Sequence, residues 1–389
     1  MIYIHIPFCR SFCTYCDFYS EIAAKCRGKE EAIRQEDMFG KFADALVREI
    51  RLRADEITDD VNTLYIGGGT PSVLPLYVYE RVLEALKETG HGGPYEEFTV
   101  EVNPEDIVDK GADYVEGLLK LGVNRISMGV QSFDDGILKF MNRRHDSDTA
   151  RNAYAVLEEA GVENISIDLI FGLPQLSDVQ WQETLDNALS ISPSGNLPQH
   201  ISSYQLSVEP GSMLAKLVER GKWSEASEEL CEQQYRMLCE ALQKAGYHHY
   251  EISNFALPGF EAKHNSAYWK HVPYIGLGPG AHSFVSGSRF WNEPDLQGYI
   301  DDPLSVRDGE TLTQDQMVLE RIMLALRTSE GISEDFLRKH CDSRRLEHAI
   351  GSGDLVRIMH GPGMDVVSGR LRIPEDRFFV SDGIIAGLV

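Results

Sequence analysis

The chain has 389 residues, of which 42% are apolar and 25% are charged, a composition that is ordinary for a water-soluble globular protein. Its formal net charge of −24 argues against binding to the phosphate backbone of nucleic acids, which requires clustered Lys and Arg. No apolar run is long enough to span a bilayer, and Met1 is followed directly by an apolar segment without a basic leader, so we expect a cytoplasmic protein.

Six short β-like runs recur along the first half of the chain, and each ends in polar or glycine-rich residues. They cover residues 2–6, 63–66, 98–102, 125–130, 165–170 and 201–206. The helix-length segments between them cover residues 36–56, 75–89, 105–121, 147–160 and 178–190. Alternating strands and helices predict βα units and a parallel sheet. We therefore expect an α/β fold with a partial (β/α)6 TIM-like barrel over residues 1–210; a closed eight-stranded barrel is the alternative if two strands lie within 240–300.

The pattern changes after residue 210. Residues 212–246 predict one or two helices, and residues 247–300 are rich in aromatic, His, Asn and Gly residues. From about Thr311 the pattern predicts, in order, helices at 317–327 and 332–339 and strand-like pieces at 364–367 and 371–373. We expect a helical, aromatic and His-rich segment over 211–310 that packs on the barrel, and a winged-helix-like α+β domain over 311–389. This last domain lacks a basic stripe, which favours packing or partner contact over DNA binding.

Three cysteines, Cys9, Cys13 and Cys16, follow the first predicted strand with the spacing C-x₃-C-x₂-C. A four-iron cluster is usually held by four thiolates, so three would leave one iron open to a substrate or cofactor. Buried structural thiols and a zinc loop are the alternatives, and zinc would need a fourth donor such as His5. We expect a [4Fe–4S] cluster that takes part in chemistry.

The chain has seven cysteines, an odd number that, without a secretion signal, fits a reducing compartment better than a disulfide framework. We expect Cys26, Cys231, Cys239 and Cys341 to be ordinary core or surface residues. Cys26 is close to the cysteine loop and is a conceivable extra ligand.

Polar and glycine residues lie at or just past the ends of several predicted strands. Gly67-Gly68-Gly69-Thr70-Pro71 follows the second strand, and no Lys-Ser/Thr pair comes after the glycines, which argues against a phosphate loop. The other residues are Glu101, Gln131, Arg143 and Asp168. Each alone could form a salt bridge at the barrel mouth. Together they favour a site for a small ligand that carries amine, carboxylate, ribose and base groups.

These motifs resemble those of the radical S-adenosylmethionine enzymes. The resemblance is carried by Tyr3-Ile4-His5-Ile6-Pro7-Phe8-Cys9, Cys13-Thr14-Tyr15-Cys16, Gly67-Gly68-Gly69-Thr70-Pro71, Glu101-Val102-Asn103-Pro104, Ser127-Met128-Gly129-Val130-Gln131-Ser132-Phe133 and Ile167-Asp168-Leu169-Ile170-Phe171-Gly172-Leu173-Pro174. It covers nearly the whole chain. Within the superfamily, the chain is most similar to the branch that contains oxygen-independent coproporphyrinogen III dehydrogenase and the HemW-like heme chaperones.

The resemblance implies a site for each cofactor. Cys9, Cys13 and Cys16 would bind the [4Fe–4S] cluster, whose fourth iron is chelated by S-adenosylmethionine. The predicted contacts of S-adenosylmethionine are Tyr3, Tyr15, Gly68, Gly69, Thr70, Glu101, Gln131, Arg143 and Asp168. In active members of the family, the reduced cluster passes an electron to the sulfonium and a 5′-deoxyadenosyl radical results.

Two departures separate this chain from the decarboxylating dehydrogenases. Those enzymes carry a further cysteine two residues after the third, where this chain has Phe18, and an extension before the first strand. This chain has instead Lys263-His264-Asn265-Ser266-Ala267-Tyr268-Trp269, which resembles the H-N-x-x-Y-W motif of the heme chaperones. The resemblance implies heme contacts at His264, Asn265, Tyr268 and Trp269, although a hydrogen-bonded turn is the alternative for His264. His248, His249 and His282 are competing ligands.

The leading hypothesis is a heme chaperone that delivers heme to respiratory hemoproteins, with the cluster and S-adenosylmethionine gating transfer or dimerisation. The chain would act as a monomer or homodimer, and peripheral contact with a membrane is left open. The first alternative is oxidative decarboxylation of coproporphyrinogen III to protoporphyrinogen IX. A radical enzyme with another substrate is the second.

Overall fold

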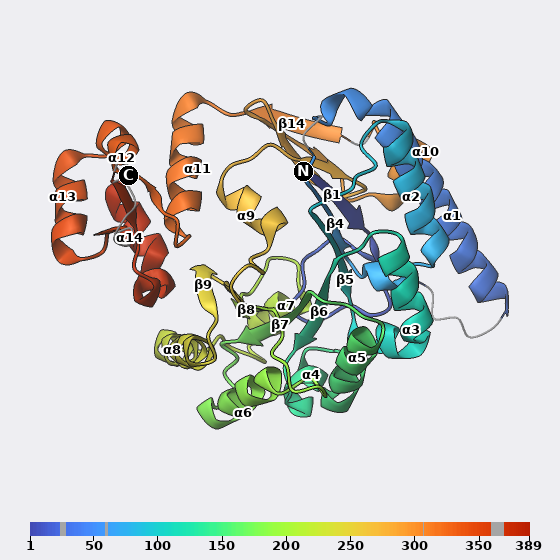
Figure 1. Cartoon of the computed structure of the whole chain (residues 1–389), viewed down its shortest axis with the longest axis horizontal. Helices are drawn as coiled ribbons and strands as arrows, with labels where there is room; N and C mark the ends of the chain where they lie inside the picture. Colours follow the sequence, from blue (N-terminus) through green and yellow to red (C-terminus); the bar gives the residue numbers. More distant parts are fainter. Residues whose placement is uncertain (24–28, 59–60, 306, 359–368) are drawn as a thin grey trace. The chain divides into compact units, whose positions relative to one another are not determined.

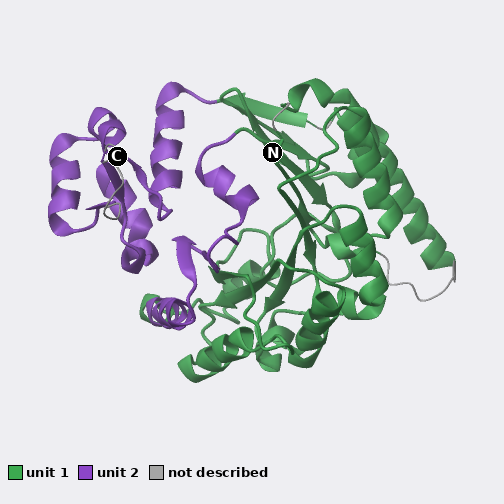
Figure 2. Ribbon diagram, in the orientation of Figure 1, with its two compact units in different colours: residues 1–231, 273–311 green, residues 232–272, 312–389 purple. Residues whose placement is uncertain are grey.

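The computed structural model describes residues 1–23, 29–58, 61–305, 307–358 and 369–389, and it divides the chain into two compact units (Figure 2). Unit 1 comprises Met1–Cys231 and Pro273–Thr311, and unit 2 comprises Glu232–Val272 and Leu312–Val389. Cys26 and the strand-like piece expected at 364–367 lie outside the described residues. No helix in the described ranges is long and apolar enough to cross a membrane.

A parallel sheet forms the centre of unit 1 (Figure 1). Its strands follow the order β11-β1-β4-β5-β6-β7-β8. Their bounds are β1 (Ile2–Ile6), β4 (Thr63–Gly68), β5 (Glu97–Val102), β6 (Arg125–Gln131), β7 (Ile165–Phe171), β8 (His200–Gln205) and β11 (Ile275–Leu277). Each neighbouring pair is parallel. The six strands expected from the sequence are confirmed, and within the described residues the order is linear, so the partial barrel is confirmed too.

Strand β1 lies between β4 and β11, and the side chains of Ile2 and Ile4 are fully buried. Three isoleucines of this strand alternate with Tyr3 and His5, whose side chains bond to each other. The register pairs Ile6 with Gly68. The chain therefore leaves the sheet for the cysteine loop directly beside the triple glycine.

Helices follow the strands of unit 1 and cover the outer side of the curved sheet in Figure 1. They are α1 (Lys29–Leu52), α2 (Leu76–Glu88), α3 (Pro104–Lys120), α4 (Asp135–Phe140), α5 (Ser147–Glu159), α6 (Asp178–Leu189), α7 (Met213–Glu219) and α10 (Leu296–Asp301), and α8 (Glu228–Lys244) runs from unit 1 into unit 2. The helices expected between the strands are confirmed. The first begins at Lys29, earlier than the expected residue 36.

Small elements complete unit 1. They are the short strands β2 (Phe8–Cys9) and β3 (Glu21–Ile22), the 3₁₀ turns η1 (Ala54–Glu56) and η2 (Pro71–Val73), and the antiparallel strands β12 (His282–Val285), β13 (Ser288–Asn292) and β14 (Arg307–Thr311). Strand β2 pairs with β3 on either side of the second and third cysteines. This pairing closes the cysteine segment into a loop.

Unit 2 consists of a hairpin, several helices and a small sheet. Its elements are β9 (His248–Glu251), β10 (Asn254–Ala256), α9 (Lys263–Trp269), α11 (Gln314–Leu326), β15 (Ile332–Ser333), α12 (Glu334–His340), α13 (Ser343–Ser352), β16 (Val356–Arg357), β17 (Arg370–Arg372), η3 (Glu375–Val380) and α14 (Ser381–Leu388). From α11 to β17 the order is helix, strand, helix, helix, strand, strand, which agrees with the expected winged-helix-like pattern.

The compact units differ in their bounds from the three segments expected from the sequence. Residues 273–311 return to unit 1 because β11 pairs with β1 along the barrel sheet. Residues 232–272 group with 312–389. The Ile252 amide donates to the Arg327 carbonyl, and the Ser329 amide donates to the Tyr250 carbonyl. The bounds of the two units are therefore set by backbone hydrogen bonds between segments that are far apart in the sequence, and each unit contains two separate stretches of chain.

Candidate functional site

The cysteine loop is held in place by residues that come much later in the chain. The amide of Thr14 donates to the Met141 carbonyl at 3.1 Å, and the Asn142 side chain donates to the Phe12 carbonyl at 2.6 Å. The Leu214 amide donates to the carbonyl of Thr14 at 2.8 Å. Hydrogen bonds from residues 141, 142 and 214 therefore help to fix the conformation of the loop between Cys9 and Cys16.

The triple glycine makes room for the chain that enters the cysteine loop. Gly69 donates its amide to the Ile6 carbonyl at 2.8 Å, and Thr70 donates to the Phe8 carbonyl at 2.7 Å. A Cβ atom at Gly69 would lie 2.7 Å from the Phe8 carbonyl oxygen. At Gly68, with φ of +106°, a Cβ atom would lie 2.6 Å from the ring of His5. The Phe8 carbonyl at Gly69, and the His5 ring and positive φ at Gly68, thus require glycine here, and contact of both glycines with a cofactor stays a prediction.

A chain of polar contacts links two of the three thiols. Thr70 Oγ1 lies 3.3 Å from Cys9 Sγ and accepts from Asn103 Nδ2 at 3.3 Å. Asn103 Oδ1 accepts from Arg143 Nη2 at 2.8 Å, and Arg143 Nη1 donates to Cys13 Sγ at 3.4 Å. We call Thr70, Asn103 and Arg143 the polar bridge. It ties the ends of β4, β5 and the turn after α4 to the cysteine loop.

The polar bridge suits an anionic thiolate group. Burial raises the pKa of the Cys9 thiol and raises that of Cys16 to about 12, so without a metal these thiols are protonated at neutral pH. Although burial opposes it, the neighbouring Tyr15 and Cys13 raise the pKa of Arg143, which keeps its positive charge. Thiolates are the donors of iron–sulfur clusters, and an adjacent guanidinium offsets their negative charge. The residues present therefore fit the cluster.

His5 is not available as a fourth zinc donor. Its Nδ1 atom lies 3.1 Å from the Tyr3 hydroxyl, and its Nε2 atom lies 2.8 Å from the Tyr19 carbonyl, so both ring nitrogens are engaged. Across the described ranges, no three His, Cys, Asp or Glu side chains are grouped so that they could hold a single metal ion.

Two partly buried carboxyl groups lie on β5 and β7, on either side of β6. Glu101 accepts from the Tyr65 hydroxyl at 2.7 Å and from the Gly68 amide at 3.1 Å. Burial raises its pKa to about 7, against the effect of these hydrogen bonds. Burial also raises the pKa of Asp168, whose Oδ1 accepts from the Ser127 hydroxyl at 3.3 Å. Both carboxyl groups are poised to accept from hydroxyl or ammonium donors of a ligand.

Gln131 stands at an irregular point of β6. The pairing with β7 shifts register between Met128 and Gln131, and Gln131 has a φ of 69°, which is rare for a residue with a side chain. The carbonyl of Gly129, inside this irregularity, accepts from Arg143 at 2.7 Å. Backbone strain of this kind clusters at functional sites, where surrounding contacts maintain it.

The structure brings most of the predicted cofactor residues together within unit 1. The rings of Tyr3 and Tyr65 lie 6.1 Å apart. Burial raises the pKa of Tyr15, and Cys13 and Arg143 are close enough to affect that pKa as well. Sequence reasoning did not assign Asn103 to the site. Its position two residues after Glu101, at the end of the same strand, is the signal that could have found it.

The predicted heme residues lie in α9 of unit 2. His264 is only 1% exposed, and its Nε2 atom lies 3.0 Å from the Tyr268 hydroxyl. Asn265, Tyr268 and Trp269 are partly exposed. His264 thus braces α9 through an i, i+4 contact, as the alternative of a hydrogen-bonded residue anticipated.

Three comparisons with known proteins bear on this site. The model of the radical SAM superfamily matches residues 3–188. The chain is 35% identical to the heme chaperone HemW of Synechocystis over 337 residues, which cover 85% of this chain and 78% of that protein. It is 33% identical to the heme chaperone HemW of Bacillus subtilis, with 85% of this chain and 84% of that protein covered.

Among solved structures, the coproporphyrinogen III oxidase HemN of Escherichia coli, described as a radical SAM enzyme, matches with a TM-score of 0.77. The match covers 99% of this chain and 89% of that one at 22% identity. At this identity the likeness shows a shared fold and nothing about the reaction.

Proposed function

The chain belongs to the HemW family within the radical SAM superfamily, and from this we propose that it is a heme chaperone that delivers heme to respiratory hemoproteins. The observation that carries the proposal is the identity of 33–35% to proteins named heme chaperones over most of their length. The alternative, oxidative decarboxylation of coproporphyrinogen III, has weaker support, because the identity to HemN is only 22%.

The superfamily implies a [4Fe–4S] cluster and S-adenosylmethionine. When bound, the cluster supplies a redox-active iron with an open coordination position. Cys9, Cys13 and Cys16 would hold it, and the cation of Arg143 would offset its charge. The proposed S-adenosylmethionine contacts are Tyr3, Tyr15, Gly68, Gly69, Thr70, Glu101, Gln131, Arg143 and Asp168. Gly68, Gly69, Thr70, Glu101 and Gln131 lie at or just past the carboxyl ends of β4, β5 and β6, where barrel enzymes build sites, and this supports the assignment.

The surroundings of Cys16 support a role other than coproporphyrinogen oxidation. Phe18 stands where the dehydrogenases carry a further cysteine, and its side chain is 67% exposed. An exposed phenyl ring cannot replace a thiolate ligand, and it leaves an apolar surface beside the cysteine loop.

Heme is the proposed cargo, and His264, Asn265, Tyr268 and Trp269 stay predicted contacts for it. The cytoplasmic location, the recipient hemoproteins and the choice between monomer and homodimer are also predictions. The proposed role of the cluster and S-adenosylmethionine is to gate heme transfer or dimerisation.

Hemin titration of the full chain, with its cluster reconstituted, tests the proposal. We expect a saturable Soret band and passage of the bound heme to an apo-hemoprotein. Anaerobic incubation with coproporphyrinogen III, S-adenosylmethionine and a reductant is the second arm, in which we expect no protoporphyrinogen. Product formation without heme binding would overturn the chaperone proposal in favour of the dehydrogenase.

A further inference from the structure

A pair of buried polar side chains lies close to the predicted cofactor residues. Glu105, in the first turn of α3, faces His145, in the turn between α4 and α5, with 3.4 Å between Oε2 and Nδ1. The His145 side chain is fully buried, and that of Glu105 is 12% exposed. Neither residue is among the predicted cofactor contacts, so the structure gives them a role that the sequence did not indicate.

The hydrogen-bonding geometry fixes the charge of the histidine. Its Nε2 atom lies 3.0 Å from the carbonyl oxygen of Val130, which can only accept, and its Nδ1 atom faces the Glu105 carboxylate. Although burial opposes it, His145 and Arg143 lower the pKa of Glu105 to about 2, so this carboxylate is ionised and also only accepts. A ring with an acceptor at each nitrogen satisfies both only as the doubly protonated imidazolium. Glu105 and His145 therefore form a buried ion pair.

The Val130 carbonyl closes a strained turn at the end of β6. It also accepts from the Ser132 amide at 2.9 Å, and Gln131 between them has a φ of 69°. A hydrogen bond that spans a single residue of positive φ is the pattern of the rarer, strained kind of γ-turn. The bond from His145 thus fastens the carbonyl that closes this turn.

The side chain of Gln131 lies next to Arg143, a second predicted cofactor contact. A Cβ atom at Gly129 would lie 2.8 Å from Gln131 Nε2 and 3.3 Å from Arg143 Nη2, so both side chains border the same glycine. Arg143 donates to the Gly129 carbonyl at 2.7 Å, and His145 binds that of Val130, the next residue. Two side chains from one short turn therefore hold two consecutive carbonyls of β6.

Glu105 connects this turn to the polar bridge. Its Oε1 atom lies 3.7 Å from Arg144 Nη1, so one carboxylate faces two neighbouring residues of the turn. Glu105 comes two residues after Asn103, the amide of the polar bridge, at the start of α3. The carboxylate thus joins the segment that carries Asn103 to the segment that carries Arg143.

We propose that this ion pair is a positioning device that holds Gln131 and Arg143 in place for S-adenosylmethionine; this rests on the proposed function. An amide and a guanidinium can bind hydroxyl, carbonyl and carboxylate groups, which this ligand carries. Because the strained turn is fixed before the ligand arrives, binding does not have to order it, and the affinity is higher. Loss of either partner should free the turn and weaken binding without removing a contact to the ligand.

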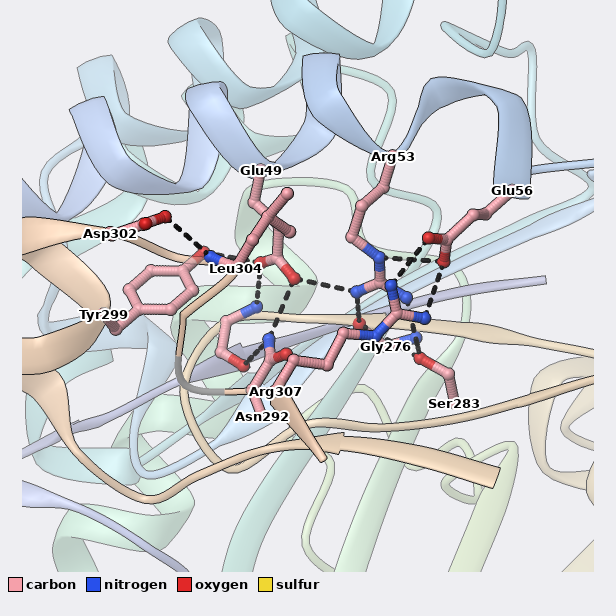
Figure 3. A network of polar contacts seen from close by, with 11 residues as sticks. Glu49, Arg53, Glu56, Gly276, Ser283, Asn292, Tyr299, Asp302, Leu304 and Arg307 are labelled. Carbon is pink, nitrogen blue, oxygen red and sulfur yellow. Dashed lines mark hydrogen bonds and ion pairs between the residues drawn. The ribbon is translucent and has the colours of Figure 1, made fainter. Parts of the chain in front are cut away.

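Another buried ion pair of unit 1 provides a structural control (Figure 3). The Glu49 carboxylate accepts from Arg53 Nη1 at 2.7 Å and from Asn292 Nδ2 at 2.8 Å. Arg53 donates in turn to the Gly276 carbonyl at 2.7 Å and to the Ser283 hydroxyl at 3.0 Å. We call these five residues the buried network. None of them is a predicted contact of S-adenosylmethionine.

Calorimetric titration of the cluster-reconstituted full chain with S-adenosylmethionine, without a reductant, tests the inference. His145→Gln and Glu105→Gln should each weaken binding by about tenfold or more, as loss of an outer partner does. The double variant should bind no more weakly than His145→Gln, because the two residues act as one pair. Glu49→Gln should unfold at a lower urea concentration than the wild type and still bind with wild-type affinity. This control separates positioning from a general loss of stability.

Nitrogen NMR of the full chain labelled with ¹⁵N-histidine tests the ion pair in the wild type, where no substitution can disturb folding. We expect a doubly protonated ring for His145 at neutral pH. Its signal is the one that His145→Gln removes. Glu105→Gln, which keeps the size of the side chain, should shift the same signal to that of a neutral ring.

Three results would overturn the inference. They are wild-type affinity in both His145→Gln and Glu105→Gln, a neutral His145 ring in the wild type, and equal weakening in Glu49→Gln. In each, the wild-type chain still binds S-adenosylmethionine, and the proposed function survives. Failure of the wild-type chain to bind S-adenosylmethionine would instead remove the proposed cofactor site and this inference with it.

Discussion

At the scale of single residues, Asn103 is the central member of the polar bridge. It donates to Thr70 and accepts from Arg143, and a side-chain amide does both at once. We expect Asn103→Ala to weaken cluster retention by on the order of 10- to 100-fold, as removal of outer partners of metal ligands does. The iron and sulfide content of the protein after desalting measures cluster retention. The control is Asn196→Ala, because Asn196 lies in an exposed loop. Equal retention in both variants would show that the bridge is dispensable.

Glu251 makes the stability of unit 2 depend on pH. Its side chain is fully buried in β9, and burial raises its pKa from 4.5 to about 7. Between these values the folded chain keeps a proton that the unfolded chain has lost, so the free energy of unfolding falls as pH rises, by up to about 3 kcal/mol. Glu251→Gln should remove this fall, measured as the urea midpoint from pH 4.5 to 8. The exposed Glu232→Gln should keep the wild-type slope, and an identical slope in Glu251→Gln would refute the assignment.

The sequence predicts which cysteines share a loop, but it does not predict which candidate side chains are exposed to solvent. The spacing of Cys9, Cys13 and Cys16 directly predicts a shared loop, because three residues of one short segment cannot be far apart. The burial of His264 could not be predicted, since it depends on its packing within unit 2. Asn103 was missed because its two partners, Thr70 after β4 and Arg143 after α4, come from distant parts of the chain.

At the scale of elements, Gly69 decides how β1 connects to the cysteine loop. Gly69→Ala places a Cβ atom against the carbonyl oxygens of Ile6 and Phe8. Both oxygens belong to the segment that enters the cysteine loop, so we expect displacement of the loop and poor cluster reconstitution. Gly40 is the matched control, because it lies inside α1 with nothing within 4 Å of its added Cβ. Gly40→Ala should reconstitute normally and gain roughly 0.5–1 kcal/mol of stability. The absorbance of the cluster near 400 nm, followed beside thermal unfolding, separates the two, and normal reconstitution of Gly69→Ala would contradict the steric argument.

The buried ion pair between Glu49 in α1 and Arg53, the residue after the helix, joins α1 to the segment around β11. Glu49→Ala leaves Arg53 buried without its carboxylate, which costs about 3–5 kcal/mol in comparable cases. Arg51, in the same helix, forms an exposed ion pair with Glu88. Glu88→Ala should lower the free energy of unfolding by at most about 1 kcal/mol. Urea unfolding compares them. Similar losses in both variants would mean that the buried network contributes no more than a surface pair.

The strands with strong apolar runs were predictable, and β11 was not. Ile275–Leu277 is too short and too rich in glycine to show a period of two, and it becomes a strand only because β1 offers an unpaired edge. Helix α1 begins before its expected start because charged residues at the first turns carry no apolar signal.

At the scale of the whole molecule, unit 2 is assembled from two separated stretches of chain. His271 and Glu320 lie 3.2 Å apart, and Lys270 and Glu330 lie 2.8 Å apart, so the first stretch is fastened to the second. A chain truncated after Thr311 should therefore leave residues 232–272 unfolded and open to proteolysis, while unit 1 stays protected. Limited trypsin digestion with mass spectrometry checks this. Protection of 232–272 in the truncated chain would show that the stretch folds by itself.

The clamps on the cysteine loop impose an order on the maturation of the protein. Phe12 and Cys13 are each held by a residue 130 positions later in the chain. At synthesis rates of 5–20 residues per second, roughly 6 to 26 s pass before the clamping residues are made. During that interval the nascent chain carries three thiols, and Cys13 lacks the guanidinium that contacts it in the folded chain. We therefore expect cluster assembly to follow the synthesis of Arg143, and until then only reducing surroundings would keep the thiols reduced.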